Sequence, residues 1–160
     1  MGRRGFLRNF IFGAEDSLVS TVGLLSGVSF AGLSSQVVVL SGIILILVEA
    51  ISMGAGAYIS EDSVNELDGK EGDNQIVDAL VMFFSYLLIG LIPLLPYLFT
   101  LDTRLAFYWS VAFSLVTLAA VGLFKGHFVG RNPWLSALKI TIIGGVVIAV
   151  AVAVGLAVKL

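Results

Sequence analysis

Long apolar stretches dominate the chain, and short polar segments separate them. A membrane-spanning helix needs about 20 consecutive apolar residues. No charged residue occurs from Ser17 to Val48, and one helix of that length would measure about 48 Å, which exceeds a single membrane crossing. The turn-forming residues at 32–36 therefore predict a break, with one helix before it and another after it.

Three further polar segments interrupt the apolar pattern, at 61–75, 101–104 and 125–133. The pattern predicts an all-α integral membrane protein with a single transmembrane domain over residues 1–160. We place its five helices at about 12–33, 37–60, 76–99, 105–124 and 134–158. The acidic segment 61–75 is expected to be a loop.

Most of the Lys and Arg residues fall on one side of this predicted membrane topology. With the N-terminus in the cytoplasm, the cytoplasmic segments hold Arg3, Arg4, Arg8, Lys70, Lys125 and Arg131, and Lys139 lies near them. The outer segments hold only Arg104 and Lys159. Because cytoplasmic loops are enriched in Lys and Arg, we expect a cytoplasmic N-terminus, a C-terminus outside and a cytoplasmic 61–75 segment.

The composition supports a membrane protein and excludes several functions. The chain is 58% hydrophobic and 12% charged, about half the charge of a typical soluble domain. A net charge of −2 leaves no basic surface for nucleic acid. The absence of cysteine excludes disulfides and thiolate metal sites. With one histidine and no zinc or Ser-His-Asp motif, we expect neither an enzyme nor a bound cofactor.

The stretch LVEAISMGAGAYIS (47–60) holds the deepest charge in the chain, Glu49. An ionisable residue at mid-membrane costs about 2.5–3.5 kcal/mol on insertion scales, which suggests a function. Met53 lies at i+4 and therefore on the same helix face. A carboxylate beside a thioether favours a divalent transition metal over Mg²⁺ or Ca²⁺. Alternatively, Glu49 is a neutral, hydrogen-bonded packing residue and Met53 fills a gap in the core.

Other residues are candidates for the ion pathway. Asp16 opens the first span beside Glu15, and Ser20 continues its face, although acids in a first helical turn also simply complement the helix dipole. Small residues near Glu49 would let another helix or a ligand approach, and prolines break the third span. The pathway candidates are Glu15, Ser20, Ser52, Gly54, Gly56, Pro93 and Pro96, and the candidates for metal entry are Glu61, Asp62 and Glu66.

Three motifs in order resemble the vacuolar iron transporter family, which includes the yeast vacuolar iron and manganese carrier. They are NFIFGAEDSLVSTVGLLSGVSFAG, EAISMGAGAYIS and GLIPLLPYLF, and the likeness covers nearly the whole chain. The resemblance implies a five-helix protein that forms a homodimer and exchanges Fe²⁺ or Mn²⁺ for protons. It also implies that Asp16 and Met53 line the ion path.

The chain departs from the family pattern in three places. The usual Asp-Gly is Asp16-Ser17 here. Some members carry a second-helix glutamate two turns before the methionine, where this chain has Leu45, and the acid stands one turn later at Glu49. Many members also carry a long cytoplasmic helical insertion that collects metal, and only 61–75 occupies that place. The resemblance therefore implies a short form with weaker metal capture.

Together these features predict a metal transporter in the membrane. We expect a site of Asp16, Glu49 and Met53 that carries Fe²⁺ or Mn²⁺ out of the cytoplasm by proton antiport, with lipid, protons and a second copy as partners. The membrane would be the cell membrane in a prokaryote, or an organelle or vacuolar membrane otherwise. The alternative is a non-transporting structural or interaction protein whose buried acids pack against a partner.

Overall fold

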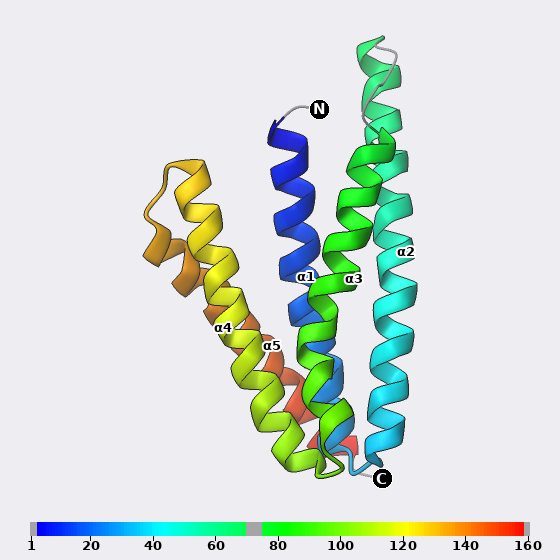
Figure 1. Ribbon diagram of the computed structural model, residues 1–160, viewed down its shortest axis with the longest axis vertical. Coiled ribbons are helices and arrows are strands. Elements are labelled where there is room, and N and C mark those ends of the chain that lie inside the picture. The colour runs from blue at the N-terminus through cyan, green and yellow to red at the C-terminus, as the bar shows by residue number, and fades with distance from the viewer. Residues whose placement is uncertain (1–2, 70–74, 159–160) are drawn as a thin grey trace.

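The computed structural model describes residues 3–69 and 75–158, and within these residues the chain forms five long helices (Figure 1). They are α1 (Arg3–Phe30), α2 (Ser35–Asp68), α3 (Gln75–Phe99), α4 (Thr103–Val129) and α5 (Pro133–Val158). Consecutive helices run antiparallel (Figure 1). The α1–α2 and α3–α4 turns therefore lie at the opposite end of the bundle from the N-terminus.

Helix α1 is the centre of the bundle. It contacts each of the other four helices. Helices α2 and α3 pack together on one side of it, and α4 and α5 form a hairpin on the other side (Figure 1). A residue on α1 can therefore meet partners from any other helix, according to the face on which it lies.

The most buried helix of the bundle is also its least apolar one. Helix α1 is the least apolar of the five spans and the most buried, whereas α5 is the most apolar and the least buried. Buried polar side chains on α1 are Asn9, Ser17, Thr21 and Ser26. Large apolar side chains on α2 and α5 face outward instead. All five helices are long and apolar enough to cross a membrane, as expected for an integral membrane protein.

Turn residues fix the helix ends. Gly69 and Gly130 adopt left-handed conformations, with φ of 62° and 68°, and end α2 and α4. Glycine adopts this conformation without a steric penalty and is common just after a helix. At the start of α4, the Asp102 carboxylate accepts backbone N–H groups from Arg104 and Leu105 at 2.9 and 3.2 Å. These caps satisfy backbone groups that the helix itself leaves free.

Several helices extend beyond the predicted spans. Helix α1 already begins at Arg3, and α4 continues to Val129, so the predicted 125–133 connector shortens to 130–132. Residues 61–68 of the predicted acidic loop are the last turns of α2. Hydropathy marks the part of a helix that suits hydrocarbon, but helical hydrogen bonds continue into polar sequence until a cap ends them. The rest of that predicted loop, 70–74, lies outside the described residues.

Small residues bring helix backbones into close contact. A Cβ at Gly122 would collide with backbone atoms of Ala137, and one at Gly126 would collide with Pro133. These contacts join α4 to α5. Because a backbone cannot move aside as a flexible side chain can, the hairpin depends on glycine at both positions.

We predict that Gly122→Ala destabilises the protein by about 1–3 kcal/mol, the usual penalty for overpacking. Gly145→Ala on α5 is the matched control, because no atom lies within 4 Å of a Cβ built there. Thermal unfolding in detergent measures both variants. Equal melting temperatures for the two variants would contradict the proposed role of the α4–α5 contact.

Candidate metal site

Asp16 on α1 and Glu49 on α2 are electrostatic neighbours across the α1–α2 interface. Their carboxylates lie close enough for their charges to interact. Two contacts fix the antiparallel register: Arg8 pairs with Glu61, and Leu25 packs against Gly42.

The register places Asp16 opposite residues 51–53 of α2. Asp16 follows Arg8 by eight residues on α1, and Met53 precedes Glu61 by eight residues on α2, so the Arg8–Glu61 pair puts Asp16 level with Met53. Asp16 precedes Leu25 by nine residues on α1, and Ile51 follows Gly42 by nine residues on α2, so the Leu25–Gly42 contact puts Asp16 level with Ile51. Asp16 therefore stands opposite the segment of α2 that follows Glu49 and ends at Met53.

Glu49 borders an open groove on the side of α2. The groove has a volume of about 350 Å³, and its other lining residues are Leu24, Ser41, Ile44, Leu45 and Val48. Glu49 and Met53 are both partly buried. A carboxylate in this apolar groove is accessible to an ion or to a second protein surface.

Ser20 and Tyr86 extend the polar surface beside the two acids. The Ser20 hydroxyl lies 2.7 Å from the Asp16 carbonyl oxygen and 2.7 Å from the Tyr86 hydroxyl. The Ser17 hydroxyl donates to the Tyr86 carbonyl at 2.6 Å, which joins α1 to α3 at this level. The Tyr86 phenol also lies within electrostatic reach of Asp16 and Glu49.

Tyr86 is a candidate that the sequence did not single out. It is fully buried and points to the site from a third helix. A tyrosine inside an apolar span is a usable signal, because its hydroxyl needs a polar partner when it is buried.

Glu15 faces a different neighbour from Asp16. Its carboxylate lies 3.8 Å from the Lys125 ammonium of α4. The Arg8 guanidinium donates to Glu61 at 3.2 Å, and the Gln75 amide donates to Asp62 at 2.5 Å. Glu66 is exposed. Three of these four acids pair with neighbouring side chains.

The small residues near Met53 have different surroundings. Gly54 is buried, and a Cβ there would lie 3.1 Å from the Cβ of Phe83 on α3. Ser52 and Gly56 are exposed on α2. Gly54 therefore serves helix packing within the chain, whereas Ser52 and Gly56 lie on its outer surface.

The prolines do not break the third span as predicted: Pro93 and Pro96 are buried within α3, which remains helical through both. Membrane helices tolerate proline because neighbouring groups satisfy the backbone that it frees. The Ser110 hydroxyl of α4 donates to the Pro93 carbonyl at 2.7 Å. This bond joins α3 to α4, so the structure gives Pro93 a packing contact away from the two acids.

The site contains oxygen and sulfur donors but few of them. Within 3–69 and 75–158, no three His, Cys, Asp or Glu side chains gather in one place. Asp16, Glu49 and Met53 together offer two carboxylates and a thioether, a mixture that suits a divalent transition metal. Octahedral coordination would require further ligands from water or from another chain.

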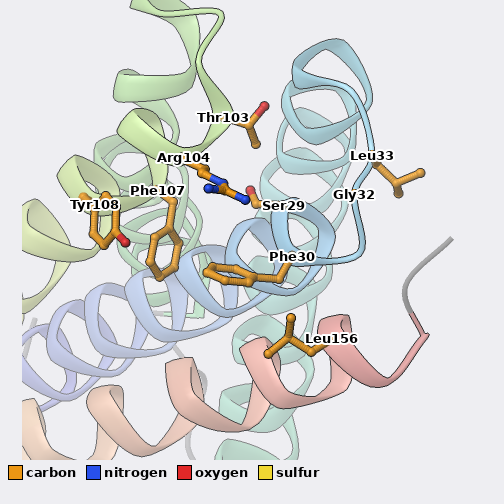
Figure 2. Close-up of a pocket in the computed structure, with 9 residues that line it drawn as sticks. All are labelled: Ser29, Phe30, Gly32, Leu33, Thr103, Arg104, Phe107, Tyr108 and Leu156. Atoms are coloured by element: carbon orange, nitrogen blue, oxygen red, sulfur yellow. The ribbon is translucent and has the colours of Figure 1, made fainter.

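A second cavity lies at the far end of the bundle and lacks acids. It has a volume of about 490 Å³ and is lined by Ser29, Phe30, Gly32, Leu33, Thr103, Arg104, Phe107, Tyr108 and Leu156. Figure 2 shows the Arg104 side chain directed into it, toward Ser29. With a guanidinium and no carboxylate among its lining residues, this cavity does not suit a divalent cation.

Known proteins resemble the chain along most of its length. It is 27% identical to "Vacuolar iron transporter 1" of Oryza sativa subsp. japonica, over 96% of this chain and 85% of the relative. It is 29% identical to "Vacuolar iron transporter" of Centaurea cyanus, over 91% and 84%. Identity is 32% with "Vacuolar iron transporter homolog 5" of Oryza sativa subsp. japonica, over 89% and 75%.

Two of these alignments are longer than the chain itself. The alignment with the first relative extends over 215 residues, more than the 160 of this chain. The sequence pattern of the VIT family matches in two segments, residues 7–75 and 61–156, which overlap at 61–75. The overlap falls at the expected place of the missing insertion. Because the two segments cover almost the whole chain, this integral membrane protein belongs to the VIT family.

Proposed function

We propose that the chain transports Fe²⁺ or Mn²⁺ out of the cytoplasm in exchange for protons. The observation that carries this proposal is that Asp16 and Glu49 lie within electrostatic reach of each other in the apolar part of the bundle, with Met53 on the next turn of α2. The family membership and the names of the relatives support a metal as the transported ion.

Two like charges in an apolar region require a reason to be there. Placing both carboxylates in the membrane is unfavourable, and their mutual repulsion adds to the penalty. A divalent cation between them would remove both penalties while it is bound. The same acids can bind protons when the metal leaves, because metal and protons compete for ionised carboxylates. This competition provides the coupling for antiport.

The charge distribution supports a cytoplasmic N-terminus. The start of α1, the end of α4 and the α4–α5 turn lie toward one end of the bundle, and the α3–α4 turn lies at the opposite end (Figure 1). By the helix bounds, Arg8, Lys125 and Arg131 belong to the first group of segments, and Arg104 begins α4 beside the α3–α4 turn. The positive-inside rule places the first end in the cytoplasm. The Glu61, Asp62 and Glu66 side chains would then stand at the cytoplasmic entrance, where they could attract cations weakly.

A second copy would complete the site. Glu49 borders an open groove, and Ser52 and Gly56 are exposed nearby on α2. Lipid is a poor neighbour for a carboxylate, whereas a two-fold dimer brings the same surface from each copy together. Such a homodimer would place four carboxylates and two thioethers around a shared path. The membrane is a vacuolar or other organelle membrane in a eukaryotic cell, or the cell membrane in a prokaryote.

We predict that Asp16→Asn and Glu49→Gln each lower Mn²⁺ uptake into proteoliposomes by about tenfold or more, because each removes a charged ligand worth about 1.5–3 kcal/mol. Asp102→Asn is the control, since asparagine retains the helix cap far from the site. Uptake that is unchanged in both site variants would refute the site and favour a purely structural role for its acids.

Replacing Met53 by leucine keeps the side-chain volume but removes the sulfur. We expect Met53→Leu to lower Fe²⁺ uptake more than Mn²⁺ uptake, because a thioether favours the softer ion. Met82→Leu on α3 is the matched control for a buried methionine. Anaerobic competition uptake with both ions measures the effect, and equal losses for the two ions would exclude sulfur ligation.

Proton coupling makes uptake depend on a pH gradient. With the cytoplasmic face outside the liposome, an acidic interior should accelerate metal uptake, because protons displace the metal on release. Collapsing the gradient with an ionophore should return uptake to the rate at equal pH. Metal uptake that is indifferent to the gradient, at the same membrane potential, would rule out antiport.

A further inference from the structure

The hydrogen bonds of Ser20 determine what the Tyr86 hydroxyl can do. A carbonyl oxygen only accepts, so the 2.7 Å bond between Ser20 and the Asp16 carbonyl uses the single proton of the serine hydroxyl. The 2.7 Å bond between Ser20 and Tyr86 then needs the tyrosine proton. Tyr86 is therefore the donor in this pair, and its phenol oxygen retains lone pairs that can only accept.

An oxygen that can only accept is an unusual neighbour for two acids. Tyr86 is fully buried on α3, within electrostatic reach of both Asp16 and Glu49. Ionised carboxylates also only accept hydrogen bonds, so none of these three groups can satisfy another. A cation among them would satisfy all three, because each oxygen has a lone pair to offer it.

We propose that Tyr86 supplies a neutral oxygen ligand to the transported cation, and that Ser20 holds it in the accepting orientation. This inference rests on the metal transport proposed above and adds a ligand from α3 to those on α1 and α2. A neutral ligand raises the coordination number without adding a negative charge, so the metal can leave more easily than from a third carboxylate. Hard oxygen donors suit Mn²⁺ in particular.

The chain provides a matched control for this pair. Tyr97 lies 3.0 Å from the Ser29 hydroxyl, and Ser29 donates to the Leu25 carbonyl at 2.6 Å. The same two helices thus carry a second tyrosine–serine pair with the same hydrogen-bond pattern. The Tyr97 pair lies nine to eleven residues further along each helix, away from the two acids. Comparing the pairs separates ligation from helix packing.

The experiment measures Mn²⁺ binding to the full chain in lipid nanodiscs by electron paramagnetic resonance. We expect Tyr86→Phe to weaken Mn²⁺ binding by about tenfold or more, while Tyr97→Phe leaves it unchanged. Ser20→Ala should also weaken binding, because the freed phenol proton would turn toward a carboxylate and block the site. Tyr86→Phe should weaken Mn²⁺ more than Fe²⁺, the opposite order to Met53→Leu.

The outcomes distinguish this inference from the proposed function. If Tyr86→Phe binds Mn²⁺ as tightly as the unaltered chain while Asp16→Asn does not, Tyr86 is not a ligand and the acidic site stands. If Tyr86→Phe and Tyr97→Phe weaken Mn²⁺ binding equally, both tyrosine–serine pairs serve helix packing and Tyr86 is not a ligand. If the unaltered chain binds neither Mn²⁺ nor Fe²⁺, the proposed function itself is wrong.

Discussion

The close packing of α1 against every other helix is the constraint on which the rest of the structure depends. A membrane offers no water to satisfy polar groups, so the least apolar helix must lie inside the bundle. Helix α1 meets this requirement because serine and glycine let its neighbours approach closely. The Ser17 hydroxyl donates to the Tyr86 carbonyl of α3, and a Cβ at Gly90 would collide with the oxygen of Ser17.

The same packing determines the chemistry of the candidate site. Since α1 touches both α2 and α3, Asp16 of α1 has Glu49 of α2 and Tyr86 of α3 among its electrostatic neighbours. No single helix could supply these donors to one ion. The outer helices α4 and α5 contribute packing and the Lys125 partner of Glu15 instead. The bundle thus separates a chemical half, built on α1–α3, from a supporting half.

Sequence pattern predicted much of this arrangement. Hydropathy gave the five helices, since each apolar stretch is long enough to cross a membrane. Helical spacing put Glu49 and Met53 on one face of α2, which holds wherever the helix is regular. The family resemblance pointed to Asp16 as their partner, and this assignment stays a prediction.

Other features could not be predicted because they depend on contacts between helices. The pattern of the third span gives no sign of which face meets α1, so Tyr86 and its bond to Ser20 remained hidden. Gly54 and Gly56 looked equivalent in the sequence, yet one packs on Phe83 and the other has open space. Helix ends also escaped prediction, since hydropathy does not register caps such as Gly69.

The extension of α2 beyond the apolar stretch has a mechanical consequence. At 34 residues, α2 is a rod of about 51 Å, and it carries Glu49 in the span and Glu61 twelve residues later on one rigid body. A tilt of this rod that opens the groove at Glu49 also moves Glu61 relative to Arg8 on α1. A change at the surface ion pair and a change at the ion site would therefore involve the same helix.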